Sequence, residues 1–231
     1  MKKALQGSLW GLVSLVAVYL PTFVLTSLVI MSGVLGKPSK TEAQFDSIPL
    51  IILISAGLAL AYMALLAKRR GQSIAAYGFK TSAPRWLLKG LGWGLALTLV
   101  LRGLAMVLPL GAAADLGDLQ RWHIVLFFWI GTPIQEELIF RGLVQTEVER
   151  RGAAALKLGK LALPFPVLVS ALLFALVHIA TARLGASLSQ VLFTVGGAFV
   201  LGLLAAGLRQ RSGSLLPCIL VHALFNIVLG G

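Results

Sequence analysis

Two adjacent glutamates and an arginine stand inside an apolar run of the chain. The stretch from Gly131 to Gly142 contains Glu136, Glu137 and Arg141, and it holds the only two of the eight acidic residues expected at membrane depth. An ionisable side chain at the centre of a bilayer costs at least about 2.5–3.5 kcal/mol. The four-residue spacing of Glu137 and Arg141 favours an ion pair on one helix face. The stretch is therefore a candidate functional site.

Two of the three histidines also lie within or at the end of apolar segments. These are His178 and His222, whereas His123 stands at the start of a span, where an interfacial role is expected. His222 and Asn226 are four residues apart, so they share one face of a helix. A lone membrane histidine is usually a packing residue, but two of them together with paired carboxylates and an amide indicate a polar site.

These residue types suit the hydrolysis of an amide bond. A carboxylate near a neutral imidazole can hold a water molecule and remove its proton, and Glu136 is the candidate carboxylate. An imidazole N–H and an amide on one helix face, as at His222 and Asn226, can donate hydrogen bonds to the oxyanion of a tetrahedral intermediate. The residues therefore predict a protease that works inside a membrane.

The composition requires a membrane environment for this chemistry. The chain has 231 residues, of which 58% are hydrophobic and 12% are charged, about half the charged fraction of a soluble domain. Its net charge of +12 comes from short basic clusters between apolar runs, which is typical of membrane proteins rather than of nucleic-acid binding. The single cysteine, Cys218, excludes an internal disulfide.

Apolar runs of about twenty residues predict an all-α, polytopic transmembrane bundle with about seven spans. The expected spans are 8–35, 48–67, 87–109, 122–148, 164–178, 187–208 and 214–229.

The spans are expected to form one membrane-embedded unit with two parts. Residues 1–110 hold the first three spans and a basic loop at 68–89, and residues 111–231 hold the four spans that carry the candidate site. A basic connector is expected between the fourth and fifth spans.

The distribution of basic residues predicts the orientation. Fourteen lysines and arginines fall in segments on the side of the N-terminus, and only four fall on the other: Lys37, Lys40, Arg121 and Arg183. This bias predicts an N-in, C-out arrangement. We expect an integral protein of the plasma membrane in a prokaryote, or of an internal membrane otherwise.

Depth along the spans tests whether the polar residues can meet. With a helical rise of about 1.5 Å per residue, Glu136 and His178 each lie roughly 21 Å from the basic end of their spans. His222 and Asn226 lie roughly 12 and 18 Å from the start of the last span. All four can therefore share a layer near the middle of the membrane.

The order and spacing of these residues resemble a known family. Three motifs on three predicted spans are similar to the signatures of the CAAX-protease and bacteriocin-processing (CPBP, or Abi) family, which includes the prenyl-protein endopeptidases. The motifs are Glu136-Glu137-x-x-x-Arg141, Phe174-x-x-x-His178 and His222-x-x-x-Asn226. The resemblance covers about residues 131–228.

The resemblance implies a role for each motif residue. Glu136 would activate the water together with His178, and His222 with Asn226 would form the oxyanion hole. The supporting residues would be Glu137, Arg141 and Phe174. Membrane lipids and a membrane-associated peptide, protein or lipidated substrate are the expected partners, and nucleic acid is not. A prenylated CAAX-type substrate and a peptide precursor both remain open.

Several alternatives compete with this interpretation. No cofactor is expected, but Glu136, His178 and His222 could bind zinc with an open position. Cys218 lies one turn before His222, so a cysteine nucleophile is a further hypothesis. A non-proteolytic scaffold or an immunity or regulatory protein could keep the same fold, and mid-membrane carboxylates also occur in proton-coupled transporters.

Overall fold

The structure is a computed structural model that describes residues 2–32, 42–113, 121–152, 155–158 and 161–229. The described chain is mostly helical, which confirms the predicted fold class. Five of its helical segments are long and apolar enough to cross a membrane, so the chain has the character of an integral membrane protein. The count of seven spans and the orientation stay predictions.

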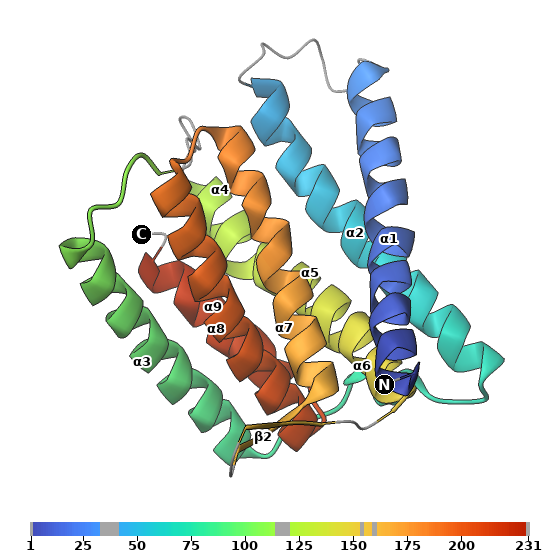
Figure 1. Cartoon of the computed structure of the whole chain (residues 1–231). Helices are drawn as coiled ribbons and strands as arrows, with labels where there is room; N and C mark the ends of the chain where they lie inside the picture. The colour runs from blue at the N-terminus through green and yellow to red at the C-terminus, as the bar shows by residue number, and fades with distance from the viewer. Residues whose placement is uncertain (1, 33–41, 114–120, 153–154, 159–160, 230–231) are drawn as a thin grey trace.

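The first half of the chain forms three long helices (Figure 1). Helix α1 covers Lys2–Met31, α2 covers Glu42–Arg69 and α3 covers Pro84–Val107. Between α2 and α3 the predicted basic loop contains a short 3-10 helix, η1 (Ile74–Tyr77). The first predicted span ended four residues beyond α1, and residues 33–41 lie outside the described ranges.

The glutamates and the arginine of the candidate site lie on one continuous helical segment, which we call the composite segment and whose helix type changes four times. It consists of α4 (Arg121–His123), the π-helix η2 (Ile124–Gly131), α5 (Thr132–Glu137), the π-helix η3 (Leu138–Val144) and α6 (Gln145–Glu149). π-Helical turns are rare and frequently occur at functional sites. Both flank the short α-helical piece that carries the two glutamates.

The basic connector after this segment contains an unpredicted β-hairpin. Strands β1 (Ala155–Leu158) and β2 (Leu161–Pro164) pair antiparallel, with Leu156 opposite Leu163. The run is too short to be told from a loop or an apolar helix end by periodicity alone.

Three helices complete the chain. Helix α7 covers Phe165–Val177 and continues as the 3-10 helix η4 (His178–Leu184), six residues beyond the predicted end of that span. Helix α8 covers Leu188–Ser212 and α9 covers Leu216–Leu229.

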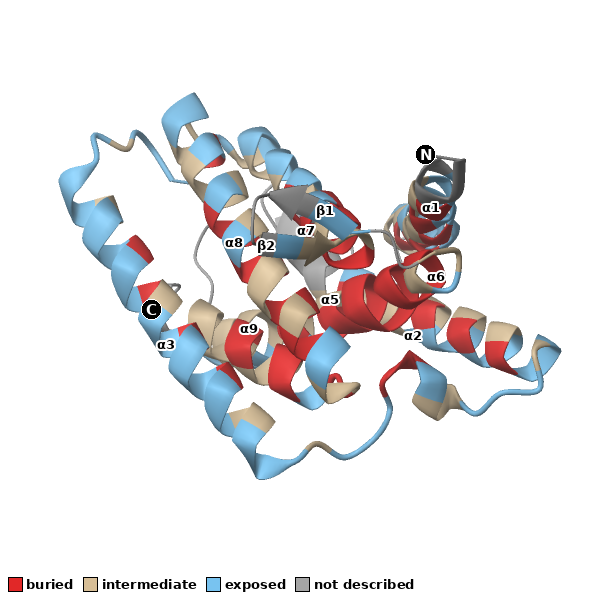
Figure 2. Cartoon of the chain, turned by 60° about the horizontal axis from the view of Figure 1, so that its bottom comes forward, coloured by how far each residue is buried: buried red, intermediate tan, exposed pale blue. Residues whose placement is uncertain are grey.

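The most buried part of the bundle surrounds the half of the composite segment that runs from the end of α5 to α6 (Figure 2). Every residue from Glu137 to Val148 is buried. Small residues allow the close packing: a Cβ at Gly202 would lie 2.9 Å from the Ala171 backbone, and one at Gly142 would lie 3.2 Å from a Met63 side chain. Because this half of the composite segment is buried on all sides, it contacts other parts of the protein rather than lipid.

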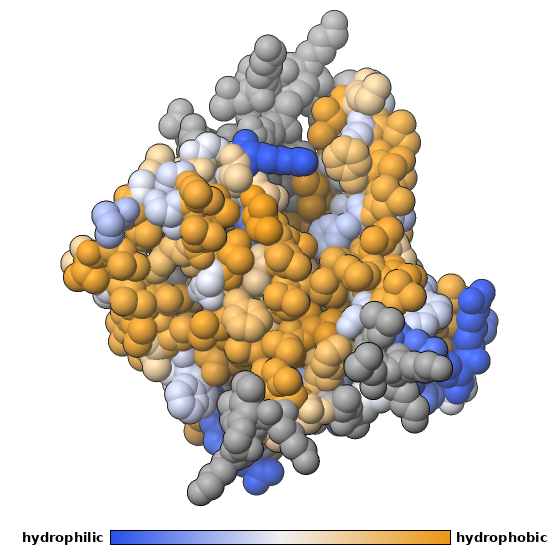
Figure 3. Space-filling view, viewed as in Figure 1, coloured by the Kyte–Doolittle hydropathy of each residue, from blue (hydrophilic) through white to orange (hydrophobic). Residues whose placement is uncertain are grey.

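The outer surface of the bundle is largely apolar, as Figure 3 shows, which suits a lipid environment. Basic side chains gather where α2, α6 and α8 end and α3 begins. We call this the basic end; it carries Arg69, Arg70, Lys80, Arg85, Lys89, Arg150, Arg151, Arg209 and Arg211.

Candidate active site

The pair Glu137 and Arg141 forms a fully buried ion pair within one turn of the composite segment. A guanidinium nitrogen lies 2.9 Å from the Glu137 Oε1 atom, and both side chains are completely excluded from solvent. Arg141 also donates a hydrogen bond of 3.1 Å to the carbonyl of Gly202 on α8. Its guanidinium lies 4.4 Å from the centre of the Phe174 ring. The charge of Arg141 is thus compensated on several sides, as a buried charge requires.

His222 connects the two adjacent glutamates. Its Nδ1 atom lies 2.9 Å from Oε1 of Glu137, and its Nε2 atom lies 3.6 Å from Oε2 of Glu136. His222 is buried, whereas the Glu136 side chain keeps 14% of its surface exposed. Of the two side chains, Glu136 is therefore the one that is not completely buried, although its Oε2 atom is itself buried.

Charge balance constrains the protons in this cluster. With both glutamates ionised, Arg141 leaves a net charge of −1, and one proton on His222 or on Glu136 makes the cluster neutral. Isolated charge is costly in a low-dielectric interior, so such a shared proton is favoured. A proton on Nδ1 of His222 is donated to Glu137, and this leaves Nε2 directed to Glu136.

His178 reaches the cluster through an aromatic ring. Its Nδ1 lies 2.8 Å from the Phe174 carbonyl oxygen, which can only accept, so Nδ1 carries a proton and Nε2 is free in the neutral ring. The structure gives His178 no hydrogen bond or ion pair with Glu136 among the described residues. The joint action of these two residues on a water molecule, which the family resemblance implies, therefore stays a prediction.

The ring of Phe174 is the common neighbour of the site. Its centre lies 4.9 Å from that of His178 and 5.5 Å from that of His222, both in edge-to-face geometry. On another side it contacts Phe140, at 5.2 Å. Such pairs contribute about 0.5–1.5 kcal/mol beyond the area that they bury. Phe174 therefore holds two imidazoles and one guanidinium in a defined relative position.

Asn226 lies in the same region but is engaged with the backbone. Its Nδ2 donates a hydrogen bond of 2.8 Å to the carbonyl of Phe128, within the π-helix η2. Ser170 makes a similar bond of 2.9 Å to the carbonyl of Phe140, within η3. Side chains from α9 and α7 thus stabilise the two π-helices, and Asn226 retains one amide proton for another acceptor.

A zinc site does not follow from this arrangement. In the part of the chain that the structure describes, no group of three or more His, Cys, Asp or Glu side chains is arranged to hold a metal ion. The ligand set Glu136, His178 and His222 is not such a group among the described residues, and a bound zinc ion stays an untested alternative.

The structure adds two site neighbours that the sequence did not indicate. Tyr19 on α1 accepts a hydrogen bond of 3.4 Å from Gln135 and lies within electrostatic range of Glu136. Neither residue belongs to a motif, and a pairing over more than a hundred residues leaves no local pattern.

A second buried acid, Glu147, was also not predicted. It lies in the polar helix α6 at the basic end, outside the apolar part of its span. Arg70 binds it with two hydrogen bonds of 2.6 and 2.9 Å, Arg151 with one of 2.8 Å, and Tyr77 with one of 3.0 Å. We call these four residues the Glu147 cluster.

Ionisation in the Glu147 cluster is strongly shifted. Burial is the largest single effect and favours the neutral acid, but the combined hydrogen bonds from Arg70, Arg151 and Tyr77 outweigh it and lower the pKa of Glu147 to about 2. Burial and the Glu147 charge raise the pKa of Tyr77 to about 12. The cluster therefore connects the end of α2 to α6 through ion pairs and to η1 through the hydrogen bond from Tyr77.

The fold and the site together define a class of protein. It is a helical membrane protein with a buried glutamate–histidine cluster whose side chains come from the composite segment, α7 and α9. Residues 118–228 match the protein-family model described as type II CAAX prenyl endopeptidase Rce1-like. The match confirms the resemblance predicted from the three motifs, and we assign this part of the chain to the CPBP/CAAX protease family. Membership of that family implies a protease, a hydrolase of peptide bonds. Comparisons with curated proteins and with solved structures found no match.

Proposed function

We propose that the protein is an intramembrane endopeptidase that cleaves a peptide bond with a water molecule activated by Glu136 and His178. The observation that carries this proposal is the contact of Glu136 with His222 inside a buried, charge-balanced cluster. The family match over residues 118–228 supports the same class of reaction.

The proposed reaction begins with a water molecule between Glu136 and His178. The Oε2 atom of Glu136 has no hydrogen-bond partner among the described residues, and Nε2 of neutral His178 has a free lone pair. Glu136 takes one proton as the water oxygen forms a bond to the carbonyl carbon of the substrate. The same proton then passes to the leaving nitrogen as the C–N bond breaks, which returns Glu136 to its starting state.

Charge develops on the carbonyl oxygen of the substrate during this attack. We propose that His222, with a proton on Nε2, and Asn226, with its second amide proton, donate to that oxygen. Glu137 supports this role because it accepts from Nδ1 of His222 and stabilises the doubly protonated imidazole. Loss of one such donor typically lowers kcat by about two to three orders of magnitude.

Both substrate classes of the sequence-based prediction, a prenylated CAAX-type protein and a peptide precursor, agree with this chemistry. The test is comparative membrane proteomics of cells with the wild-type protein and with Glu136→Gln, which preserves shape but removes the base. An uncut precursor should accumulate with Glu136→Gln. Glu149→Gln, on the same helical segment but outside the site, is the matched control and should leave processing unchanged.

The same variant separates the enzyme from its non-enzymatic alternative. If the cellular phenotype of the protein survives Glu136→Gln, a scaffold, immunity or regulatory role is correct and the protease assignment is wrong. Retention of normal amounts of the variant protein in the membrane must be shown in parallel, by quantitative immunoblotting.

A further inference from the structure

Burial along the composite segment changes abruptly at the candidate base. Residues on the side of Glu136 that faces away from the basic end are mostly half-buried or exposed, with Leu126, Ile130 and Ile134 more than one-third exposed. Beyond Glu136, all residues from Glu137 to Val148 are buried. Glu136 therefore lies at the boundary between an open and a closed half of the bundle.

The closed half is the one next to the basic end. There α1 packs directly on the composite segment, since a Cβ at Gly11 would lie 3.1 Å from Val148. The Glu147 cluster joins α2, η1 and α6 at the same end. Arg151, one of its members, also lies over the Trp10 ring of α1, at 4.3 Å. Direct contacts therefore join α1, the end of α2 and η1 to the composite segment at this end.

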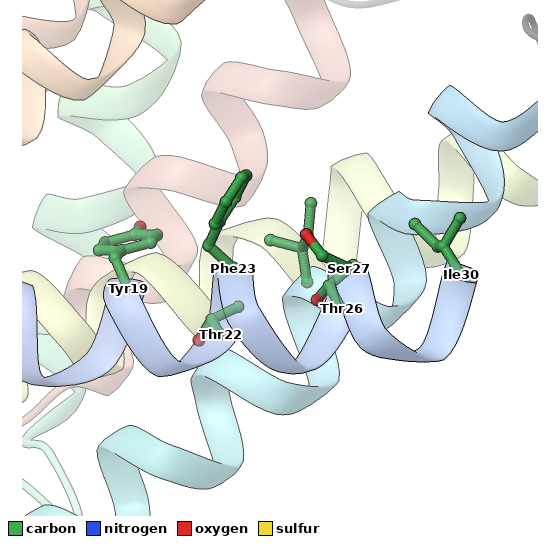
Figure 4. A pocket seen from close by; sticks show the side chains of 7 residues that line it. Tyr19, Thr22, Phe23, Thr26, Ser27 and Ile30 are labelled. Carbon is green, nitrogen blue, oxygen red and sulfur yellow. The ribbon is translucent and has the colours of Figure 1, made fainter. Parts of the chain in front are cut away.

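A groove opens on the opposite side. It runs along α1 toward the end away from the basic loops, has a volume of about 240 Å³, and is lined on the other side by Ile51 of α2. Figure 4 shows the α1 residues that line it: Tyr19, Thr22, Phe23, Thr26, Ser27 and Ile30. The space-filling view shows the molecule hollowed beside α1 in the same half (Figure 3).

The inner end of the groove lies beside helix α5, which carries the candidate base. Tyr19 lines the groove and is bonded to Gln135, the residue directly before Glu136. Toward the outer end, Thr26 is buried and its hydroxyl has no partner among the described residues. Hydroxyls of this kind can pair with the polar backbone of an extended peptide, which needs partners in a membrane.

We propose that Glu136 is reached from the end of the bundle opposite the basic end, through the groove between α1 and α2. Where the protein acts as the proposed protease, its substrate is then a polypeptide whose scissile bond enters from that side. If the basic end faces the cytoplasm, as the charge bias predicts, this route suits a peptide precursor presented from the opposite face of the membrane rather than a prenylated CAAX-type protein.

The test measures access to position 136 directly and does not depend on proteolysis. Cys218 is buried and is the only cysteine of the chain, so Cys218→Ala gives a cysteine-free background. In this background, Glu136→Cys is treated with a charged, membrane-impermeant methanethiosulfonate reagent in right-side-out and in inside-out vesicles. Gln72→Cys marks the basic end, and Ala113→Cys marks the opposite end.

Glu136→Cys should react only from the face at which Ala113→Cys reacts. Adding Ser27→Trp, which fills the groove, should suppress this reaction, whereas Leu25→Trp on an exposed part of α1 should leave it unchanged. Val144→Cys, in the closed half, should not react from either face.

Reaction of Glu136→Cys from the face of Gln72→Cys, or from neither face, would overturn the proposed route. An unchanged reaction in the presence of Ser27→Trp would exclude the groove. Because the labelling experiment measures access alone, its outcome is independent of the outcome of the cleavage assay with Glu136→Gln.

Discussion

The Nδ1 atom of His222 and a guanidinium nitrogen of Arg141 both lie 2.9 Å from the same oxygen of Glu137. One carboxylate oxygen therefore orients an imidazole from α9 and a guanidinium from its own helix. This arrangement sets the tautomer of His222 when the ring is neutral, because Nδ1 must carry the proton that Glu137 accepts. The supporting glutamate is thus a positioning residue for the histidine that touches Glu136.

Removal of Arg141 should destabilise the protein. Arg141→Ala leaves Glu137 buried without its counter-ion, and breaking a buried pair in this way costs about 3–5 kcal/mol. Arg141→Lys should not restore full stability, because lysine lacks the planar guanidinium that bonds Glu137 and Gly202 and contacts Phe174. Thermal unfolding of the detergent-purified variants measures the effect, and a wild-type Tm for Arg141→Ala would refute the structural role of the pair.

Replacement of Phe174 should lower the cleavage activity much more than the stability of the protein. Phe174→Leu keeps an apolar side chain in the core but removes the ring that contacts His178, His222 and Arg141. We expect a loss of roughly 1 kcal/mol of stability, within the range of hydrophobic swaps, and a much larger relative loss of cleavage.

Phe199→Leu on α8 is the control for Phe174→Leu, because Phe199 packs partly buried against the core and its ring contacts neither imidazole among the described residues. It should change Tm by a similar amount without a comparable effect on cleavage. Equal effects of the two variants on turnover of an identified substrate would show that Phe174 has only a packing role.

Replacement by alanine at two glycines of α3 should have opposite effects on the stability of the protein. A Cβ at Gly90 would lie 2.8 Å from the carbonyl oxygen of Pro217 on α9, so Gly90→Ala forces the two helices apart. Overpacking of this kind costs about 1–3 kcal/mol. At Gly92 no atom lies within 4 Å of a new Cβ, and Gly92→Ala should stabilise α3 by about 0.5–1 kcal/mol through helix propensity. Thermal unfolding of the two variants side by side tests the α3–α9 contact.

Stability should depend on pH through Glu147. Its pKa is lowered from 4.5 to about 2 in the folded protein, so the unfolded state binds a proton more readily than the folded state. The stabilising contribution of Glu147 is therefore fully present above about pH 4.5 and is lost as the pH falls toward 2.

Glu147→Gln should remove this part of the pH dependence and lower the stability at neutral pH. The measurement is the Tm of both proteins in detergent across pH 2 to pH 7, compared as a difference so that other carboxyl groups cancel. A difference between wild type and variant that does not change with pH would contradict the assigned ionisation.

Much of the site was predictable because its residues carry a strong local signal. Ionisable groups in apolar runs are rare, and simple helical rise placed Glu136, His178 and His222 at similar depth. The precise partners were not predictable, because the π-helices on both sides of Glu136 change which faces of the segment point inward. His222 contacts both glutamates, and among the described residues His178 is linked to His222 through the ring of Phe174.

The remaining unpredicted contacts depend on distant parts of the chain. Arg70 and Glu147 are 77 residues apart, and Tyr19 and Gln135 are 116 residues apart. Neither spacing has a period that a helix or a strand would impose. The β-hairpin was missed for another reason, since its two strands of four residues are shorter than a periodic pattern needs.

The Glu147 cluster also determines how the first two helices can move. Helices α1 and α2 are attached to the rest of the bundle near the basic end. Toward the other end α2 still contacts η2, since a Cβ at Gly131 would lie 3.4 Å from Ile52, whereas α1 stands apart from α7 and α8 in Figure 1. A helix held at one end has its largest displacement at the other. Small changes of tilt where Arg151 contacts Trp10 of α1 would therefore become wide changes in the mouth of the groove, so that an arginine far from Glu136 affects how large a chain can pass.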